Sequence, residues 1–199
     1  MHVSKWMVTD IITVKKDTDI KEAIRLMEKY SIRHLPVVEE GRFVGFVTEG
    51  DLRQLLIPAM LEDIKVKDVM ITDPITVTPE TDIETAAKLI YQYKIGGLPV
   101  LKGNKLVGII TTTDILRAFI EMMGILMAGS RLDVVIGDSP QAFKEVYNII
   151  HRHNGRLISL GILPNEHETI YSFRLERCEL EPIIEALTAR GYKVISTFP

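Results

Sequence analysis

The chain has 199 residues, a formal net charge of −3 at pH 7 and a sequence pI near 6.0. Because there is no basic excess, the charge pattern of a nucleic-acid-binding protein is missing. A single cysteine excludes an intramolecular disulfide framework and is typical of a reducing compartment. The N-terminus lacks a signal-peptide core, and the most apolar stretch, residues 115–128, is too short to span a bilayer. We therefore expect a cytoplasmic protein that binds neither nucleic acid nor membrane.

An internal repeat dominates the sequence. Residues 3–54 align without a gap with residues 66–117, and about 20 of the aligned pairs are identical. This agreement indicates two copies of one supersecondary unit. Units of about 60 residues are marginally stable alone, so the copies are expected to pair with each other or in a dimer.

Each copy predicts a short strand, a helix, two strands joined by a tight turn, and a second helix. Helix starts are indicated at residues 17–19 and 81–84, the latter with the spacing of a capping box. Apolar spacing indicates one buried face on the first helix of each copy, formed by Ile20, Ala23, Ile24 and Met27, and by Ile83, Ala86, Ala87 and Ile90. The tight turns are expected at Glu40-Gly41 and Gly103-Asn104. The second helices are expected from about Glu49, ending near Pro58, and from about Thr112.

Both copies contain the pattern Gly-apolar-apolar-Thr-x-x-Asp where a strand meets a helix, at residues 45–51 and 108–114. One interpretation is structural, with the threonine and the aspartate capping the helix as a pair. The other is a ligand site. A helix N-terminus attracts a phosphate, a threonine hydroxyl can donate to it, and a carboxylate can accept from both hydroxyls of a ribose. Occurrence of the pattern twice favours the ligand site, but both interpretations stay open.

The whole repeat resembles the CBS domain (cystathionine-β-synthase domain), and the pair resembles the module in which two such domains pack through their sheets. The resemblance implies a cleft between the domains that holds AMP, ADP, ATP or S-adenosylmethionine as a regulatory ligand, with no cofactor required. Carried over by position, Asp51 and Asp114 would hold the ribose, and Thr48 and Thr111 would contact the ribose or phosphate. The resemblance further implies adenine contacts and pocket walls from the residues Ile12, Thr13, Ile75, Thr76, Pro36 and Pro99.

The two copies differ before the Leu-Pro-Val strand. The first has Arg33-His34 where the second has Gly96-Gly97. In similar proteins basic residues at this place reach the phosphates, so Arg33 and His34 are candidate phosphate ligands, or else part of a solvated loop. Arg53 and Arg117 add charge at non-equivalent positions after the two aspartates. We expect one high-affinity site and not two equal ones.

Beyond Met122 the repeat ends. An apolar segment with two glycines, residues 123–130, is expected to be a hinge. Residues 131–199 predict the order βαββαβ, which is ferredoxin-like. One helix is expected from Pro140 to His153, with Phe143, Val146, Tyr147 and Ile150 on one face and Asn154-Gly155 as its left-handed end. A turn is expected at residues 164–167.

This C-terminal segment resembles an ACT domain, a small regulatory module that often binds amino acids at dimer interfaces. The corresponding ligand corner is Gly137-Asp138-Ser139-Pro140, but Gln141 follows where the family commonly has glycine. Amino-acid binding and a purely dimerising role both remain open. A CBS pair followed by an ACT-like domain is similar to the bacterial acetoin-utilisation regulatory proteins.

No local catalytic motif is present: the sequence lacks a nucleophile elbow, a phosphate-binding P-loop and a dinucleotide fingerprint. His151 and His153 are interpreted as cations at a helix C-terminus and not as metal ligands, and Cys178 as incidental. The expected architecture is α+β, with CBS domains at residues 1–61 and 62–122, a hinge, and an ACT-like domain. We therefore expect a homodimeric, non-enzymatic sensor of adenosine nucleotides, with a possible protein target. The alternatives are a dimeric scaffold with vestigial clefts and an amino-acid sensor.

Overall fold

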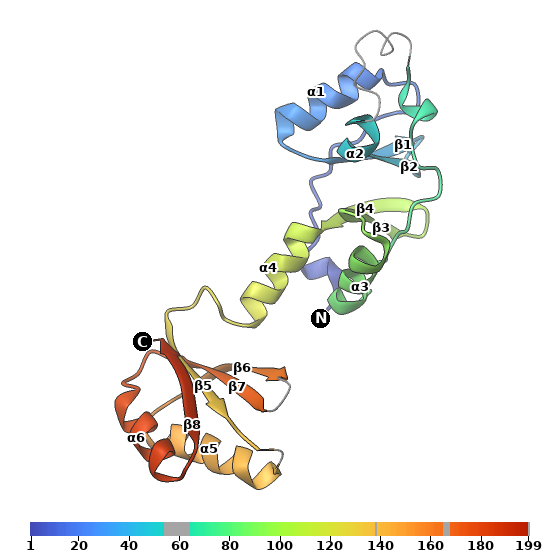
Figure 1. The fold of residues 1–199 in the computed structure, drawn as a ribbon. Coiled ribbons are helices and arrows are strands. Elements are labelled where there is room, and N and C mark those ends of the chain that lie inside the picture. Colours follow the sequence, from blue (N-terminus) through green and yellow to red (C-terminus); the bar gives the residue numbers. More distant parts are fainter. Residues whose placement is uncertain (54–63, 138, 165–167, 199) are drawn as a thin grey trace. The chain divides into compact units, whose positions relative to one another are not determined.

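The computed structural model describes residues 1–53, 64–137, 139–164 and 168–198. The chain divides into two compact units, Met1–Ala118 and Phe119–Pro199 (Figure 1). The first unit contains the two sequence repeats, and the second contains the C-terminal βαββαβ elements. Within the described ranges no helix combines the length and the apolar character that a membrane crossing requires.

The two repeats contain the same elements in the same order. The first has α1 (Ile20–Tyr30), β1 (His34–Glu39), β2 (Arg42–Thr48) and α2 (Glu49–Arg53), and the second has α3 (Ile83–Tyr93), β3 (Gly97–Lys102), β4 (Lys105–Thr111) and α4 (Thr112–Met122). The predicted helix faces are buried except at Ile24 and Ala87, which are half-buried, and the strands form the predicted antiparallel hairpins. Glu40, Gly41 and Gly103 take up positive φ in the turns, as tight hairpins require. Pro58, the predicted end of α2, lies outside the described residues.

The first predicted strand of each repeat is reduced to one bridging residue. Val14 pairs in parallel with Val37, and Val77 with Val100. Val14 donates to the Pro36 carbonyl at 3.0 Å and accepts from Val38 at 2.9 Å. The next bond of a parallel ladder would need the N–H of Pro36, which proline lacks, so pairing stops there. The β-α-β-β-α description therefore holds only with a single-residue first strand.

The predicted capping box of the second repeat is wrong. α3 begins after Asp82, which makes no side-chain cap bond. The Thr81 hydroxyl instead accepts the backbone N–H of Thr78 at 3.0 Å, so a local turn uses the group that would have capped the helix. In the first repeat α1 likewise begins after Asp19, without a side-chain cap.

The segment that precedes each repeat packs on the other repeat. Val3 donates to the Thr81 carbonyl at 2.8 Å, and Val8 pairs with Ile109 of β4. In the same way Val66 donates to the Thr18 carbonyl at 2.9 Å, and the segment reaches Phe46 of β2. We call residues 1–8 and 64–71 the exchanged arms. A linear cut between residues 61 and 62 therefore separates each arm from the repeat that it packs against.

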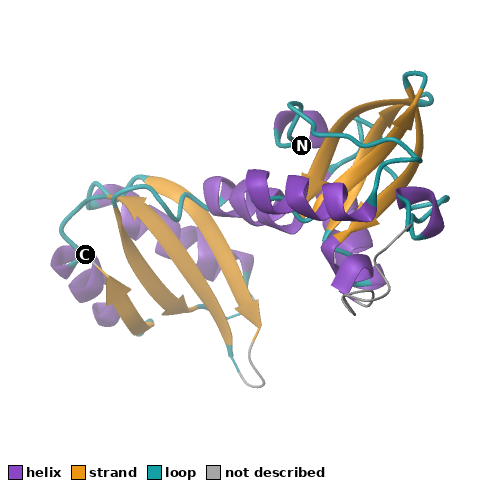
Figure 2. Cartoon of the chain, turned by 90° about the horizontal axis from the view of Figure 1, so that it is seen from above, coloured by secondary structure: helices purple, strands orange, loops and turns teal. Residues whose placement is uncertain are grey.

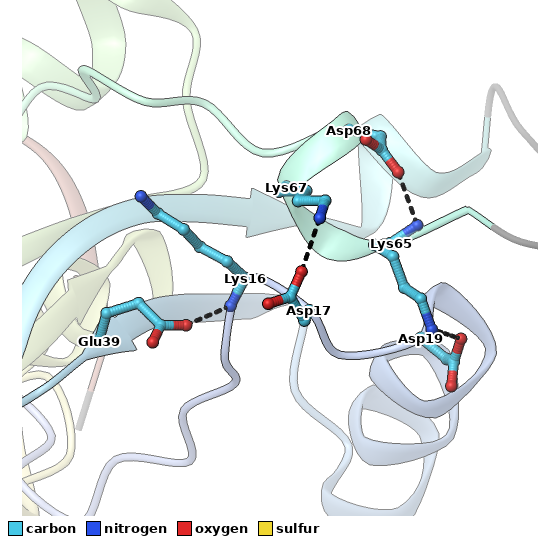
Figure 3. Close-up of polar contacts among 7 residues, drawn as sticks. All are labelled: Lys16, Asp17, Asp19, Glu39, Lys65, Lys67 and Asp68. Atoms are coloured by element: carbon cyan, nitrogen blue, oxygen red, sulfur yellow. Dashed lines mark hydrogen bonds and ion pairs between the residues drawn. The ribbon is translucent and has the colours of Figure 1, made fainter.

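Ion pairs fasten the second arm to the first repeat (Figure 3). Lys67 Nζ lies 2.7 Å from Asp17 Oδ1, and Lys65 Nζ lies 2.5 Å from Asp19 Oδ1. The bond from Lys67 lowers the pKa of Asp17, while the same carboxylate raises the pKa of Lys67. Asp17, Asp19 and Lys67 are exposed and Lys65 is half-buried, so these pairs orient the arm more than they stabilise it.

The two repeats also share an apolar cluster. Phe46 of β2 and Ile109 of β4 occupy equivalent positions, and together with Phe43 they form a buried group at most 8% exposed. Burying large apolar side chains of this kind stabilises by about 1.5–3 kcal/mol each. The hairpins of the two repeats are therefore held together by a core of their own, in addition to the arms.

The C-terminal unit has the predicted βαββαβ order. Its elements are β5 (Gly129–Val135), α5 (Pro140–Arg152), β6 (Leu157–Pro164), β7 (Thr169–Glu176), α6 (Glu181–Ala189) and β8 (Lys193–Phe198). The antiparallel sheet has the order β6-β7-β5-β8, with both helices on one face (Figure 2). Leu132, Val134 and Phe173, which are fully buried, form part of the core beneath the helices. β5 begins at Gly129, inside the segment predicted as a hinge.

The predicted apolar face of α5 is buried only in part. Val146 and Ile150 are buried and Phe143 packs against them, but Tyr147 is 39% exposed. Its ring stacks on His151 with the centroids 6.2 Å apart. Tyr147 lies at the margin of the apolar stripe, where a tyrosine keeps its hydroxyl in water. Asn154 has φ 62°, as predicted for a left-handed helix end, and the predicted turn at residues 164–167 lies largely outside the described residues.

Candidate functional site

The two Thr-x-x-Asp motifs have the same geometry. In the first, Asp51 Oδ2 accepts the Thr48 backbone N–H at 2.9 Å and its hydroxyl at 2.7 Å. In the second, Asp114 Oδ2 accepts the same two groups of Thr111 at 2.9 and 2.7 Å. Each aspartate N–H in turn donates to the threonine hydroxyl oxygen, at 3.3 and 3.4 Å. The structural interpretation is therefore correct: each pair is a capping box.

This capping box limits what each residue can offer a ligand. The single hydroxyl proton of Thr48 or Thr111 is already donated to the aspartate, so neither threonine can donate to a phosphate without breaking the cap. Every capping bond to Asp51 and Asp114 ends on Oδ2. Oδ1 of each carboxylate takes no part in the cap. Capping and binding of hydroxyl groups are therefore compatible on the same aspartate.

The glycine of each motif is explained by the exchanged arms. A Cβ on Gly45 would lie 2.8 Å from Met70 Sδ and 3.0 Å from the Ile71 carbonyl oxygen. A Cβ on Gly108 would lie 2.5 Å from Met7 Sδ and 3.2 Å from the Val8 carbonyl oxygen. Only glycine lets the arms approach this closely. These glycines therefore position the strands that end at Thr48 and Thr111.

The predicted adenine contacts lie beside the two prolines. Residues 12–13 and 75–76 precede Val14 and Val77, whose N–H groups donate to the carbonyls of Pro36 and Pro99 at 3.0 Å in both repeats. The prolines are buried in β1 and β3. Because a proline has no N–H, the strand ladder offers no donor to the carbonyl of Ile12 or Ile75. The backbone at these positions is thereby left outside the ladder.

The residues before β1 and β3 are tied to the helix starts. Glu49 donates its backbone N–H to the Arg33 carbonyl at 2.9 Å, and Thr112 donates to the Gly96 carbonyl at 3.0 Å. The Thr112 hydroxyl adds a second bond to Gly96 at 3.2 Å. Arg33 itself is exposed. The position predicted to reach phosphates is therefore held next to the capped helix start in each repeat.

His34 lies between the two repeats. It pairs in register with Thr48 across the first hairpin, and its ring stacks on Phe46 at 5.7 Å with 15° between the planes. A Cβ on Gly96 would lie 2.7 Å from His34 Nε2, and one on Gly97 would lie 3.5 Å from the same atom. Burial lowers the pKa of His34, assisted by the positive charge of Arg33 and opposed by Asp51 and Glu49.

The two other predicted cations are placed differently. Arg53 Nη2 lies 2.9 Å from Glu49 Oε1 on the surface of α2. The Arg117 guanidinium lies over the ring of Trp6, 5.7 Å from its centre, so the first arm contacts α4. The two arginines therefore have different partners, as expected from their non-equivalent positions in the two repeats.

Sequence reasoning missed the partners of His34. Phe46 was assigned only to a strand, and the pair Gly96-Gly97 only to a loss of charge. The sequence did contain a signal for this contact. A glycine pair in one copy, at the position of a bulky pair in the other, is typical of a place where the two repeats approach closely.

In the described ranges no cluster of three histidine, cysteine, aspartate or glutamate residues is arranged to hold a metal ion. The Cys178 backbone N–H donates to the hydroxyl of Ser130.

Comparisons with known proteins match the repeat region. The family model for the CBS domain matches residues 3–58 and 66–121. An inosine-5'-monophosphate dehydrogenase from Korarchaeum cryptofilum is 32% identical over 170 residues, which cover 79% of this chain and 35% of that enzyme. The CBS domain-containing protein YhcV from Bacillus subtilis is 33% identical over 132 residues, 65% of this chain and 91% of YhcV. This chain thus spans about a third of the length of the dehydrogenases that it matches.

Solved structures resemble the same region. CBSX2 in complex with AMP has a TM-score of 0.55 at 30% identity, over 60% of this chain and 96% of that chain. The CBS domain pair of protein MJ0100, in complex with 5′-methylthioadenosine and S-adenosyl-L-methionine, has the same TM-score and identity over 60% and 99% of the two chains. An acetoin utilization protein (AcuB) from Vibrio cholerae has a TM-score of 0.57 at 29% identity over 63% and 95%. The chain therefore belongs to the CBS-domain family, with two consecutive copies of the domain in its first 121 residues.

Proposed function

We propose that this chain is a regulatory protein that binds an adenosine nucleotide between its two CBS domains. The observation that supports it most is the duplicated helix start, in which Thr48 with Asp51 and Thr111 with Asp114 have the same hydrogen bonds. Solved relatives at 30% identity hold AMP, or S-adenosyl-L-methionine with 5′-methylthioadenosine. AMP, ADP, ATP and S-adenosylmethionine are the ligands that we expect.

The geometry suggests roles for the predicted residues other than Thr48 and Thr111, whose hydroxyl protons are used in the helix caps. Oδ1 of Asp51 or Asp114 accepts from the ribose hydroxyls, while Oδ2 keeps the helix cap. The backbone beside Pro36 and Pro99 meets the adenine, because the ladder leaves the carbonyls of Ile12 and Ile75 without a donor. The neighbouring Thr13 and Thr76 belong to the same segments. Arg33 and His34 stand beside the cap of the first repeat, where a phosphate would be attracted.

The test is calorimetric titration of nucleotide-free protein with the four ligands, repeated on Asp51→Asn and Asp114→Asn. Asparagine keeps one carbonyl oxygen for the capping bonds but turns an amide, which cannot accept, toward the ribose. We expect one variant to weaken AMP binding at least tenfold while its unfolding midpoint stays near that of the wild type. AMP lacking its ribose 2′-hydroxyl should lose affinity for the wild-type protein and little for that variant. If none of the four ligands binds the nucleotide-free protein, the proposed function is wrong.

For the C-terminal unit we propose an ACT-like regulatory role. Its support is the element order βαββαβ and the sheet order β6-β7-β5-β8. The full chain would relay nucleotide binding to this unit or to a protein target, and would act as a homodimer. Titration of the full chain with a panel of amino acids separates the two possibilities for this unit: binding indicates an amino-acid sensor, and its absence favours a dimerising role.

A further inference from the structure

The helices of the C-terminal unit line a cavity with an excess of positive charge. α5 and α6 lie on the same face of the sheet (Figure 2), and a cavity of about 350 Å³ lies where the polar side of α5 meets Arg190, at the end of α6. Pockets for small ligands begin at roughly this size. The charged residues of its lining are Lys144, Glu145, Arg152 and Arg190. Three cations therefore stand against one carboxylate, in a chain whose net charge is −3.

The periodicity of α5 gathers the polar residues of the cavity. Glu145, Asn148 and Arg152 follow one another at intervals of three and four residues, so they lie on one side of the helix. Val146 and Ile150, on the opposite side, are buried in the core of the unit. Burial of the apolar side therefore turns the polar side outward, where the cavity lies.

The one carboxylate of the cavity is already neutralised. Glu145 Oε1 accepts from Arg190 Nη1 at 2.5 Å, and Glu145 Oε2 accepts from the Tyr192 hydroxyl at 2.9 Å. Burial raises the pKa of Tyr192, assisted by its bond to Glu145, so the phenol keeps the proton that it donates. A guanidinium has five N–H donors, and the bond to Glu145 occupies only one nitrogen of Arg190. Glu145 therefore orients Arg190 and leaves it able to bind a second acid.

The remaining polar groups have no partner. Among the described residues no carboxylate lies within ion-pair distance of Lys144 or Arg152, and the half-buried amide of Asn148 makes no hydrogen bond with any of them. Ile149, which also lines the cavity, is half-buried and packs against the core of the unit. Unpaired cations, a free amide and an aliphatic surface together suit an anion with a carbon chain.

The spacing of the cations favours an anion with two charged ends. Glu145, which holds Arg190, lies seven positions before Arg152, a separation of about 10 Å along the helix axis. Glutarate, a dicarboxylate of five carbons, measures about 5 Å between its carboxyl carbons. A hydrogen bond of about 3 Å at each end extends its reach to this separation. A monocarboxylate or an inorganic phosphate would reach only one of the two arginines.

We propose that this cavity binds a small aliphatic dicarboxylate, with one carboxylate on Arg190 and the other on Arg152 and Lys144. The carbon chain packs against Ile149. Guanidinium groups match carboxylates through paired N–H donors, which makes arginine the suitable cation at both ends. The excess of positive charge disfavours a ligand with an ammonium group, and no residue of the cavity belongs to the corner at residues 137–140. The site is therefore distinct from an amino-acid site, and it does not depend on nucleotide binding.

The experiment is an NMR titration of the isotope-labelled full chain with glutarate, compared with butyrate, inorganic phosphate and glutamate. It is made at low salt, because exposed charges are screened at high salt. We expect glutarate to shift the amide resonances of α5 and α6 saturably, and the other three ligands to bind at least about fivefold more weakly.

The variants locate the site. Arg152→Gln and Lys144→Gln should each weaken glutarate binding by at least about fivefold, because each removes a charged donor without disturbing an ion pair. Arg177→Gln is the matched control, since Arg177 is an exposed residue of the same unit that lines a different cavity. It removes the same charge and should change the affinity less than about twofold.

The contrary outcomes are equally definite. No saturable shift up to about 10 mM glutarate, or shifts confined to the corner at residues 137–140, would overturn the proposal. Butyrate, phosphate or glutamate binding as tightly as glutarate would do the same, because the cavity would then not select two carboxylates. So would unchanged glutarate binding by a folded Arg152→Gln variant. The wild-type titration decides the matter even if that variant does not fold, and none of these results bears on AMP binding.

Discussion

A single glycine in each repeat controls how closely the exchanged arm can approach. Gly45→Ala and Gly108→Ala would press a methyl group against methionine sulfur and carbonyl oxygen at 2.5–3.2 Å. We expect each substitution to reduce the free energy of unfolding by about 1–3 kcal/mol, the usual cost of overpacking. Trp6, the one tryptophan of the chain and 3% exposed, makes its fluorescence a suitable probe of urea unfolding.

Gly50→Ala is the matched control. It lies in α2 without positive φ, and its Cβ would meet only Thr48 Oγ1 at 3.5 Å. Alanine there should be neutral or stabilising, since glycine costs about 0.5–1 kcal/mol in a helix. If Gly45→Ala, Gly108→Ala and Gly50→Ala had equal urea unfolding midpoints, the close approach of the arms to the strands would not limit stability.

The lowered pKa of His34 predicts how stability depends on pH. Burial depresses the pKa in the folded protein, so between that value and the ordinary value of about 6.5 the unfolded chain binds more protons. The contribution of His34 to the free energy of unfolding therefore rises with pH through this window. It is fully present above the window and absent below it. We expect His34→Gln to flatten the wild-type curve in urea unfolding between pH 5 and 8. A steeper curve for the variant would contradict the depressed pKa.

For single residues, the motif positions could be predicted from the sequence, but their contacts could not. Thr48 and Asp51 were identified as either a cap or a ligand pair, and the bonds show that the cap exists and that Oδ1 stays outside it. The contact of His34 with Gly96 was missed, because it joins residues far apart in sequence. The capping box at Thr81 was predicted wrongly, because propensity alone does not reveal that the Thr78 N–H competes for the hydroxyl.

Among the elements, the exchanged arms give the most specific prediction. Val3 and Val66 are both completely buried, each on the repeat that its own segment does not belong to. Val3→Ala should destabilise the second repeat and Val66→Ala the first, each by roughly 2 kcal/mol from lost burial and a small cavity. Hydrogen exchange checks this by comparing protection of β3 and β4 with that of β1 and β2.

Each substitution serves as the control for the other. Loss of protection should be crossed, with Val3→Ala affecting β3 and β4 first. If Val3→Ala instead exposed β1 and β2 first, each arm would stabilise its own sequence repeat and the exchange would be of little energetic importance.

Helices and hairpins could be predicted because their signals are local. The apolar spacing on α1 and α3 and the turn at Glu40-Gly41 depend on neighbours a few residues away. The exchange of arms could not be predicted, since it depends on pairing such as Val8 with Ile109 across most of the unit. The exposure of Tyr147 could not be predicted, because helical periodicity places a residue on a face but does not show how far the neighbouring elements cover that face.

For the whole molecule, every proposed nucleotide contact lies in the first unit. Phe173 is fully buried in the core of the C-terminal unit, and Phe173→Ala should destabilise that unit by about 3–5 kcal/mol. We nevertheless expect AMP to bind this variant with unchanged affinity in calorimetry. Loss of binding would mean that the C-terminal unit contributes to the nucleotide site.

The crystal structure of the full chain with AMP tests the central claim most directly. We expect the ribose hydroxyls within hydrogen-bond distance of Oδ1 of Asp51 or Asp114, with the capping bonds to Oδ2 intact and the phosphate beside His34. AMP bound on the C-terminal unit, or away from both aspartates, would contradict the proposal that the paired CBS domains form the nucleotide site.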